Sequence, residues 1–504
     1  MRIIRTHEMS PEDLSEWDRD MVYNGLDCCV TLDVFDGLRP QLDNLTTTTY
    51  EFSKSLQAPT LEMRARGVLV DQVRKAEVID EYYETMERLE ANLLRIVHEG
   101  VGMSTFNYRS TRDLATLFYD ELGIHPIRKA GRPTVDRGAR EKLEIYPIAE
   151  QLVKHINLLT ELGDKISVLK TAIDDDGRIR TSYNIAGTST GRFSSSISEF
   201  GTGGNLQNVE ESLRSIFIAD AGYKFAKCDA KSGESFAVGG IEWNLFHDGR
   251  YLDMCETGDP HTAIARVCWP DDPWTGDIKK DAKIAGAPFY RHHSKRQTTK
   301  KVGHASNYAG KPNTIATQTG MPLELIKNFQ PIYFKTFPAH EMWHEYVDNT
   351  LRKNGYLISL TGRKRWFFGR RSDADTLRGA IAFDPQCSLA DIVNTAMLNI
   401  WRKGYVIICM HEHDALTFMY PQKDEDKIIP QLLNDLVISI PLAHGRTLRI
   451  PYDCKVGWNK GEYNEQTNPN GLKDFYGHDN RKRIKEMGLL DRLVAKRSKK
   501  SVDL

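Results

Sequence analysis

Two short segments with an aspartate at their ends, residues 225–229 and 406–414, constrain the fold of this chain most strongly. The first, Phe-Ala-Lys-Cys-Asp, is a partly apolar run, which is typical of a β-strand with Asp229 at its end. In the second, an apolar run leads into His-Glu-His-Asp and another apolar run follows, which predicts a β-hairpin with Asp414 at its turn. An aspartate at a hairpin turn and one at the end of a neighbouring strand can meet across a sheet.

Paired carboxylates of this kind suit two divalent ions about 3.5–4 Å apart, the arrangement for in-line phosphoryl transfer. On this pair alone the alternative stays open that Asp229 and Asp414 are turn or cap residues, because 69 acidic residues offer many such pairs. A separate signal for phosphate binding is needed to decide between the two interpretations.

Residues 295–310 carry such a signal. They place Arg296, Lys300, His304 and Tyr308 at successive i+4 spacings, so that the four side chains share one face of a helix. Cations at the start of that face and a flat ring at its end predict a surface that grips a triphosphate and stacks on a base pair. The alternative is a basic, solvated helix face.

Length and composition limit the class of protein. The chain has 504 residues, with 68 Lys and Arg against 69 Asp and Glu, which excludes a uniformly basic nucleic-acid coat but allows a locally basic groove. The longest clean apolar run, residues 405–410, is far shorter than the roughly 18–20 residues of a membrane span, and the N-terminus has no apolar signal segment. The eight cysteines are irregularly spaced. We therefore expect a cytoplasmic protein without a membrane partner.

The coarse organisation is mixed. Residues 70–98 and 137–173 are long polar stretches that predict helices, and residues 259–350 are again mostly helical. Ser110-Thr-Arg-Asp is a capping signature that opens a further helix. Residues 355–369 alternate as a strand does.

The two ends of the chain differ in charge. Residues 1–60 hold five Lys or Arg and eleven Asp or Glu, whereas residues 481–500 hold nine and two. The basic end is either a solvated helix or disordered tail, or an arm that contacts phosphates independently of sequence.

Five motifs follow one another along the chain: Thr188-Ser-Thr-Gly-Arg-Phe-Ser-Ser; Asn205-Leu-Gln-Asn; Asp229 with Glu234; Arg296 and Lys300 with Tyr308 and Gly310; and His413-Asp414. In this order they resemble the motifs of the DNA polymerase I family, also called family A. The resemblance runs from about residue 60 to about residue 462. It implies an α+β, right-hand polymerase fold with an antiparallel palm sheet, helical fingers and a helical thumb.

The resemblance also implies a division of the chain. We expect a remnant or part of a 3′–5′ exonuclease in residues 1–59, the thumb in 60–190, the palm in 191–258 and 370–465, the fingers in 259–369, and a basic tail in 466–504.

Roles carry over to the matching positions. Asp229 and Asp414 would hold two Mg²⁺ ions, and Lys300 would donate a proton to departing pyrophosphate. The residues expected to bind the dNTP are Arg296, Lys300, His304, Tyr308, Glu234 and His261, with Glu234 excluding a 2′-hydroxyl. Those expected to contact primer or template are Arg192, Asn208, Gln386 and His413.

The implied reaction is extension of a primer 3′-hydroxyl with dNTPs on a DNA template by two-metal phosphoryl transfer. Three alternatives stay open: a single-subunit RNA polymerase, a catalytically dead DNA-binding replisome scaffold, and a lesion-bypass or gap-filling role. Glu234 and the motif that contains Arg192 favour DNA synthesis, and both metal aspartates argue against the scaffold. The sequence shows no 5′ nuclease, no complete exonuclease and no targeting signal, which would suit a compact, phage-like replicase in a bacterial cytoplasm.

Three departures from the family pattern lie within the motifs or shortly after them. Ala415 stands where a second acid usually follows Asp414, and we expect an active enzyme with altered metal affinity. His304 replaces the usual Phe or Tyr, which leaves the selection of the sugar open. Glu210 and Glu211 stand where a proline and a basic residue are usual, so that Arg214 is the candidate to replace the missing arginine.

The N-terminal segment departs as well. Tyr23 and Asp27 resemble the last motif of the proofreading exonuclease, but only 22 residues precede Tyr23 in this sequence. A two-metal nuclease needs several acids in one cluster, so we expect no intrinsic proofreading. The segment is either a relic that packs on the thumb or the part that completes an exonuclease on a separate chain.

Overall fold

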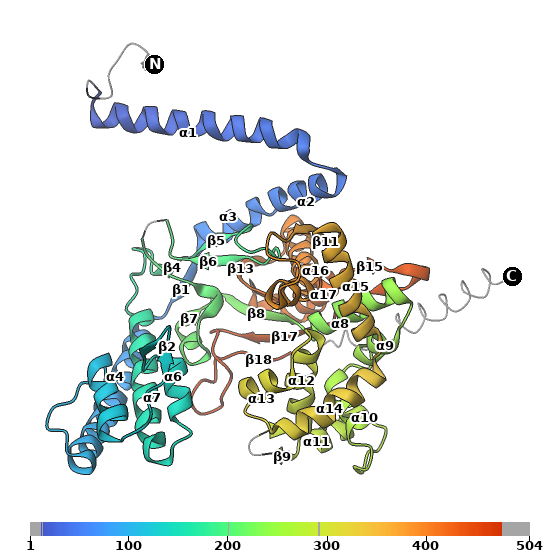
Figure 1. Ribbon diagram of the computed structural model, residues 1–504. Coiled ribbons are helices and arrows are strands. Elements are labelled where there is room, and N and C mark those ends of the chain that lie inside the picture. Colours follow the sequence, from blue (N-terminus) through green and yellow to red (C-terminus); the bar gives the residue numbers. More distant parts are fainter. Residues whose placement is uncertain (1–11, 13, 200, 291–292, 476–504) are drawn as a thin grey trace.

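A five-stranded antiparallel sheet forms the centre of the molecule, and helical units lie on either side of it (Figure 1). The computed structural model describes residues 12, 14–199, 201–290 and 293–475. The strand order is β13-β14-β8-β17-β18, so segments far apart in the sequence become neighbours. The strands are β8 (Tyr223–Ala230), β13 (Ile407–Glu412), β14 (Ala415–Pro421), β17 (Tyr452–Gly457) and β18 (Lys473–Asp474).

The two faces of this palm sheet have different surroundings. Because side chains alternate along a strand, Ala226, Cys228 and Ala230 of β8 lie on one face and Lys227 and Asp229 on the other. The first three are buried in the largest apolar core, together with residues of the helices that cover that face. Those helices are α8 (Gly233–Phe246), α16 (Ala374–Lys403) and α17 (Glu425–Leu436). The strand predicted over residues 225–229 is confirmed, with Asp229 on the face that the helices leave open.

The N-terminal helical unit packs around α4 (Gln72–Arg95) and α7 (Pro147–Leu169). Met86 and Leu93 of α4 are buried in one apolar core with Leu152 and Ile156 of α7. The stretch 137–173, which was predicted to be helical, contains two helices. The second begins at Pro147, which lacks a backbone N–H and therefore suits the first turn of a helix. The further elements of this unit are the π-helical turns Ile96–Val101 and Thr116–Glu121, α5 (Thr111–Ala115), α6 (Arg137–Leu143), β2 (Arg128–Lys129) and β3 (Arg132–Pro133).

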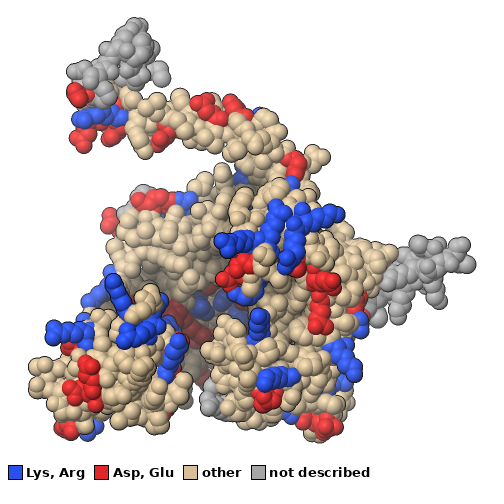
Figure 2. All heavy atoms as spheres, viewed as in Figure 1, with Lys and Arg blue, Asp and Glu red and all other residues tan. Residues whose placement is uncertain are grey.

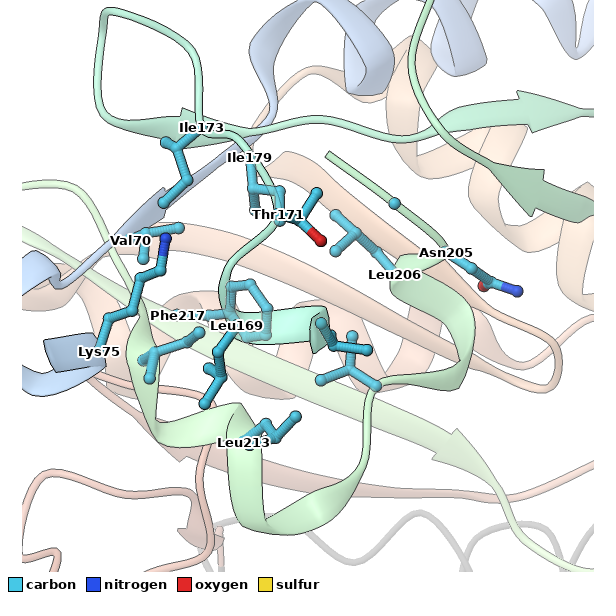
Figure 3. A pocket seen from close by; sticks show the side chains of 14 residues that line it. Val70, Lys75, Leu169, Thr171, Ile173, Ile179, Asn205, Leu206, Leu213 and Phe217 are labelled. Atoms are coloured by element: carbon cyan, nitrogen blue, oxygen red, sulfur yellow. The ribbon is translucent and has the colours of Figure 1, made fainter. Parts of the chain in front are cut away.

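A small sheet joins this unit to the palm. Strand β1 (Val68–Val70) pairs with β4 (Arg178–Ile179) on one side and with β7 (Phe217–Ile218) on the other. A cavity of about 40 Å³ lies at this junction, lined mainly by apolar side chains such as Val70, Leu169 and Phe217 (Figure 3). None of the predicted site residues lines it, so it is a packing gap between two units. Nearby, β5 (Ser182–Asn184) pairs with β6 (Ser194–Ser196).

The second helical unit lies between α8 and α16 in the sequence, as expected for residues 259–350. Its central helix is α12 (Lys295–Asn307), which begins with a capping box between Ser294 and Gln297. The other helices are α9 (Arg250–Cys255), α10 (Pro260–Cys268), α11 (Ile278–Gly286), α13 (Pro312–Thr319), α14 (Leu323–Thr336) and α15 (Ala339–Asn354). Two hairpins complete the unit: β9 (Pro288–Tyr290) with β10 (His293–Ser294), and β11 (Tyr356–Ile358) with β12 (Lys364–Trp366).

The two ends of the chain are arranged differently. Helix α1 (Glu16–Leu38) projects from the body, and α2 (Asn44–Ser55) and α3 (Gln57–Arg66) lead back to it (Figure 1). At the other end, β18 and the buried Leu472 extend the palm fold past the predicted boundary at residue 465. The basic run 481–500 lies outside the described residues. Among the helices of the described part, none combines the length and the apolar character that crossing a membrane requires.

Candidate active site

Asp229 and Asp414 lie at the same end of two paired strands. The hairpin β13–β14 turns through His413 and Asp414, and His413 adopts the left-handed conformation (φ 62°) that two-residue hairpins require. Strand β14 pairs with β8 so that Ala415 lies opposite Asp229, and the backbone N–H of Ala230 donates to the carbonyl of Asp414 at 3.0 Å. The predicted meeting of the two aspartates across the sheet is therefore confirmed in its backbone geometry.

The electrostatic surroundings of both carboxyls disfavour their ionised form. Burial and the neighbouring Asp414 raise the pKa of Asp229 to about 6, while Lys227 opposes the shift. Burial also raises the pKa of Asp414, against a backbone hydrogen bond and the guanidinium of Arg192. Two carboxylates that repel each other in this way gain stability from a bound cation.

The donor set fits Mg²⁺. Both groups offer hard oxygen ligands, and within the described part of the chain neither carboxylate forms an ion pair with a Lys or Arg side chain. Over the described residues no cluster of three or more His, Cys, Asp or Glu is arranged to hold a metal alone. Mg²⁺ typically binds proteins through one or two carboxylates and takes its other oxygens from water and substrate phosphates, which suits this pair.

Asp229 has different neighbours on its two sides. Ala415 flanks it on β14, and Asp453 of β17 lies opposite it on the other side. Within the hairpin, the buried Glu412 pairs with Ala415 and forms an ion pair with the buried Lys460 at 2.7 Å. Position 415, directly after Asp414, is thus apolar. Its two cross-strand neighbours, Glu412 on β13 and Asp229 on β8, are both acids.

Glu234 is the point at which three predicted site residues converge. It lies in the first turn of α8, one residue after the left-handed Ser232 and the following glycine. Arg192 donates to Glu234 Oε1, and the hydroxyl of Tyr308 donates to Oε2. The Nε2 atom of His304 lies 3.7 Å from the same oxygen. Burial, and next the negative charge of Glu234, raise the pKa of Tyr308, which keeps this hydroxyl a donor.

Helix α12 presents the predicted cationic face. Lys300 and His304 are exposed and Arg296 is half-buried, whereas residues between them pack inward. Arg296 donates to Asp259 at 2.8 Å, and Lys300 has no ion pair with a described residue. The helix ends at Asn307, so Tyr308 caps the helix in place of continuing it. Within the helix Arg296, Lys300 and His304 share one side, whereas Tyr308 follows the helix, with its ring centre 5.0 Å from that of His304.

His261 joins this group from α10. Burial, and next the charge of Arg296, lower the pKa of His261 to about 4, so its ring is neutral near pH 7. Its backbone carbonyl accepts from Thr299 of α12 at 2.9 Å. The ring atom Nδ1 is buried without a hydrogen-bond partner among the described residues, which leaves it available to a ligand.

The four residues predicted to contact primer or template do not form one group. His413 Nε2 lies 3.4 Å from the side-chain oxygen of Asn208, which brings these two together. Arg192 instead belongs to the Glu234 cluster. Gln386 lies half-buried on α16 and shares no hydrogen bond or ion pair with the other three in the described part of the chain.

A cavity of about 250 Å³ opens beside Asp229. Its lining includes Arg214, which the sequence left as the candidate for a missing arginine, and Glu211. Glu210 turns away, since it pairs with Lys165 of the N-terminal helical unit at 2.7 Å. The remaining charged lining residues are Lys227, Asp453, Lys455, Lys460, Glu462 and Asp474.

A buried network anchors the end of α12, and sequence reasoning did not identify it. Asn307 donates to the hydroxyl of Tyr251 at 2.9 Å and accepts from that of Tyr333 at 2.6 Å. His340 lies 3.1 Å from the same Tyr333 hydroxyl and hydrogen-bonds Glu242 of α8. Since these residues come from five helices or their ends, no spacing in the sequence could have indicated the network.

Two comparisons of sequence place these motifs among known proteins. A family model described as DNA polymerase family A matches residues 74–235 and 282–463. The chain is 24% identical to DNA polymerase I, thermostable, of Thermus filiformis over 84% of its own length and 49% of that protein's. It is 25% identical to DNA polymerase I of Chloroflexus aurantiacus over 83% and 44% of the two lengths. The chain thus spans about half the length of the curated relatives it matches.

A solved structure has the same fold. It is described as the POL domain of Pol1 from M. smegmatis in complex with DNA primer-template and dNTP. The match has a TM-score of 0.71 at 21% identity and covers 86% of this chain and 75% of that one. It confirms the predicted α+β right-hand architecture, in which the five-stranded sheet is the palm and helical units form the thumb and fingers.

Proposed function

Since the chain belongs to DNA polymerase family A, we propose that it extends a primer 3′-hydroxyl with dNTPs on a DNA template. The observation that carries this proposal is that Asp229 and Asp414 lie at one end of two paired strands, close enough to interact through their charges. Asp414 also interacts with Glu234, which the hydroxyl of Tyr308 links to the cationic helix α12. The division of the chain proposed with it keeps the boundaries expected from the sequence, except that the palm continues through β18.

The proposed mechanism assigns one task to each group. Asp229 and Asp414 would hold two Mg²⁺ ions, and the chemistry these supply is activation of the primer hydroxyl and neutralisation of the phosphates. Lys300 and Arg296 bind the triphosphate, and the Nζ of Lys300 gives its proton to departing pyrophosphate. Glu234, held by Arg192 and Tyr308, occupies the space that a 2′-hydroxyl would need.

The proposal is tested by extension of a 5′-labelled primer–template with dNTPs, with rNTPs and without nucleotide, beside Asp414→Ala. Extension with dNTPs only, lost in the variant, supports it. Extension with rNTPs at equal efficiency would indicate the alternative RNA polymerase. DNA binding without extension in either nucleotide set would indicate the scaffold.

We also propose that the active enzyme works in a bacterial cytoplasm, as expected for a phage replicase.

We infer a second partner from α1. Large apolar side chains are normally buried, yet Trp17, Tyr23 and Leu26 of this helix are 72%, 66% and 56% exposed. The same helix is acidic and carries Asp27 four residues after Tyr23, on an exposed surface. We propose that a 3′–5′ exonuclease with a basic, partly apolar groove binds α1 and that Asp27 joins its carboxylates.

Co-expression with the candidate exonuclease chain tests this partner. Full-length protein should co-purify with it, and deletion of residues 1–45 should abolish the complex while primer extension persists. Trp17→Ala with Leu26→Ala should weaken the complex, whereas Ile145→Ala, an equally exposed apolar side chain on the thumb, should not. Shortening of a labelled primer by the polymerase chain alone, without nucleotide, contradicts the expected lack of intrinsic proofreading.

A further inference from the structure

Residues 352–371, at the C-terminal end of the fingers, form a segment whose charged residues are all basic. They contain seven Lys or Arg and no Asp or Glu, and they run from the end of α15 through β11 and β12 toward α16. Figure 2 shows basic side chains gathered on the surface over this region, where Figure 1 labels α15 and β11. Surfaces of one sign attract polyanions, and their contribution falls with salt.

The base of the segment lies next to the cluster around Glu234. Arg363 forms an ion pair with Asp391 of α16 at 2.7 Å. Its guanidinium packs against Gly191, where an added Cβ would lie 3.0 Å from Arg363 Cζ. The next residue, Arg192, donates to Glu234. The basic segment therefore has its base beside the cluster around Glu234, where the dNTP is proposed to bind.

Exposed aromatic rings lie along this surface. Trp366 is 50% exposed and Phe368 is 96% exposed. The Nζ of Lys364 lies 5.1 Å from the ring centre of Trp366 and 4.5 Å from that of Tyr356, and these two rings are 4.8 Å apart. Tyr356 and Lys364 thus fix the Trp366 ring and leave part of it open to solvent. Phe368, two residues after Trp366 in the sequence, adds a second aromatic ring that is open to solvent.

Two cations of the same segment are available. Lys353 and Arg370 are exposed and form no ion pair with a residue in the part of the chain that the structure describes. Other basic residues of the segment serve the protein itself, since Arg352 pairs with Asp348 and Arg371 donates to the carbonyl of Arg352. Lys364 also pairs with Asp43, at 3.0 Å.

Open rings beside free cations are a surface for single-stranded nucleic acid. Cations alone would bind the phosphates of a duplex equally well, but the bases of a duplex are stacked on one another and cannot stack on a side chain. Because the surface begins at Arg363, next to the pocket in which a templating base is read, the strand that reaches it first is the template ahead of the primer end.

We propose that Trp366 and Phe368 stack on unpaired bases of the template 5′ overhang, and that Lys353 and Arg370 bind its phosphates. This inference rests on the proposed polymerase function and names the part of the substrate that the fingers hold. It predicts that the affinity for primer–template rises with overhang length. It also predicts that the gain depends on these rings.

The test is equilibrium binding of the full chain, in Ca²⁺ without nucleotide, to fluorescent duplexes that are blunt or carry a template overhang of about ten nucleotides. Wild-type protein should bind the overhang duplex about tenfold more tightly, and Trp366→Ala with Phe368→Ala should lose that gain while binding the blunt duplex unchanged. Trp366→Phe with Phe368→Tyr should retain it. Trp17→Ala, an exposed tryptophan on α1, is the matched control.

Three results overturn the proposal. An equal loss on blunt duplex would show a general defect, and an unchanged overhang gain would show that the rings do not stack. A loss confined to a duplex with a frayed primer end and no overhang would assign the surface to the primer strand. Binding is measured without catalysis, so its result does not depend on whether the protein extends primers. Failure of this proposal can therefore be distinguished from failure of the proposed polymerase function.

Discussion

Ala415 on β14 lies directly opposite Asp229 on β8. Directly paired residues of adjacent antiparallel strands have side chains within contact distance on the same face. Position 415 is therefore the nearest cross-strand neighbour of a proposed metal ligand, and it is 2% exposed. A side chain there acts on Asp229 through its charge as well as its volume.

Substitution Ala415→Glu should lower the Mg²⁺ concentration needed for half-maximal primer extension, because a third oxygen donor would face the pair. Without divalent ions the same variant should be less stable than wild type near pH 8, since a further carboxylate raises the pKa of Asp229 again. Ala415→Gln, of equal size without charge, separates charge from volume. Identical Mg²⁺ titrations for the two variants would show that the charge has no effect.

Asp229→Asn should abolish extension yet stabilise the fold in the absence of divalent ions. The pKa of this carboxyl is raised to about 6 from 3.8, so the folded protein holds its proton more tightly and loses stability as the pH rises through that interval. Above about pH 6 the variant escapes a cost of about 1 kcal/mol, after discount for solvent exposure. Below about pH 4 the two proteins should have equal stability.

Urea unfolding in EDTA at both pH values measures this difference. Asp348→Asn, which removes a surface partner of Arg352, is a control that should not gain stability at the higher pH. A variant that is destabilised at both pH values would contradict the predicted repulsion between Asp229 and Asp414.

The buried ion pair between Glu412 and Lys460 should be costly to break from one side. Lys460→Met leaves Glu412 buried with only the Thr417 hydroxyl, at 2.9 Å, and should lower the free energy of unfolding by about 3–5 kcal/mol. Glu412→Met with Lys460→Met should recover most of this loss, because no unpaired charge remains. The exposed pair of Lys154 and Glu150 is the control, and Lys154→Met should cost about 0.5 kcal/mol or less.

Tyr308→Phe should weaken discrimination against rNTPs. The ring is retained, but Glu234 loses a donor and keeps only Arg192 and the more distant His304, so its side chain is less firmly placed. Hydrogen bonds to charged groups contribute about 1.5–3 kcal/mol, and we expect the ratio of kcat/KM for dNTP over rNTP to fall about tenfold or more. Glu234→Ala should reduce the ratio further. Tyr346→Phe, which removes an exposed hydroxyl from α15, should leave it unchanged.

Local patterns predicted the parts of the site that lie within one element. The i+4 spacing from Arg296 to His304 defined the exposed side of α12, because a helix repeats its faces whatever surrounds it. The apolar runs on either side of residues 411–414 predicted the hairpin, and Ser110 predicted the start of α5 through its bond to the Asp113 N–H. These features depend on interactions over a few residues.

Contacts between elements depended on tertiary structure. Strand pairing set Asp229 between Ala415 and Asp453, and a different register would have changed both neighbours. Packing of helices brought Tyr308 and Arg192 to Glu234, and it buried Lys460 beside Glu412.

The sequence by itself therefore determined which residue types stand on each helix face and at each turn, since short-range hydrogen bonds and side-chain periodicity decide them. Only the tertiary structure decided which of these residues meet, how strongly their charges interact and which rings stay exposed. Those properties arise from burial and from contacts between segments far apart in the chain, and no local pattern encodes them.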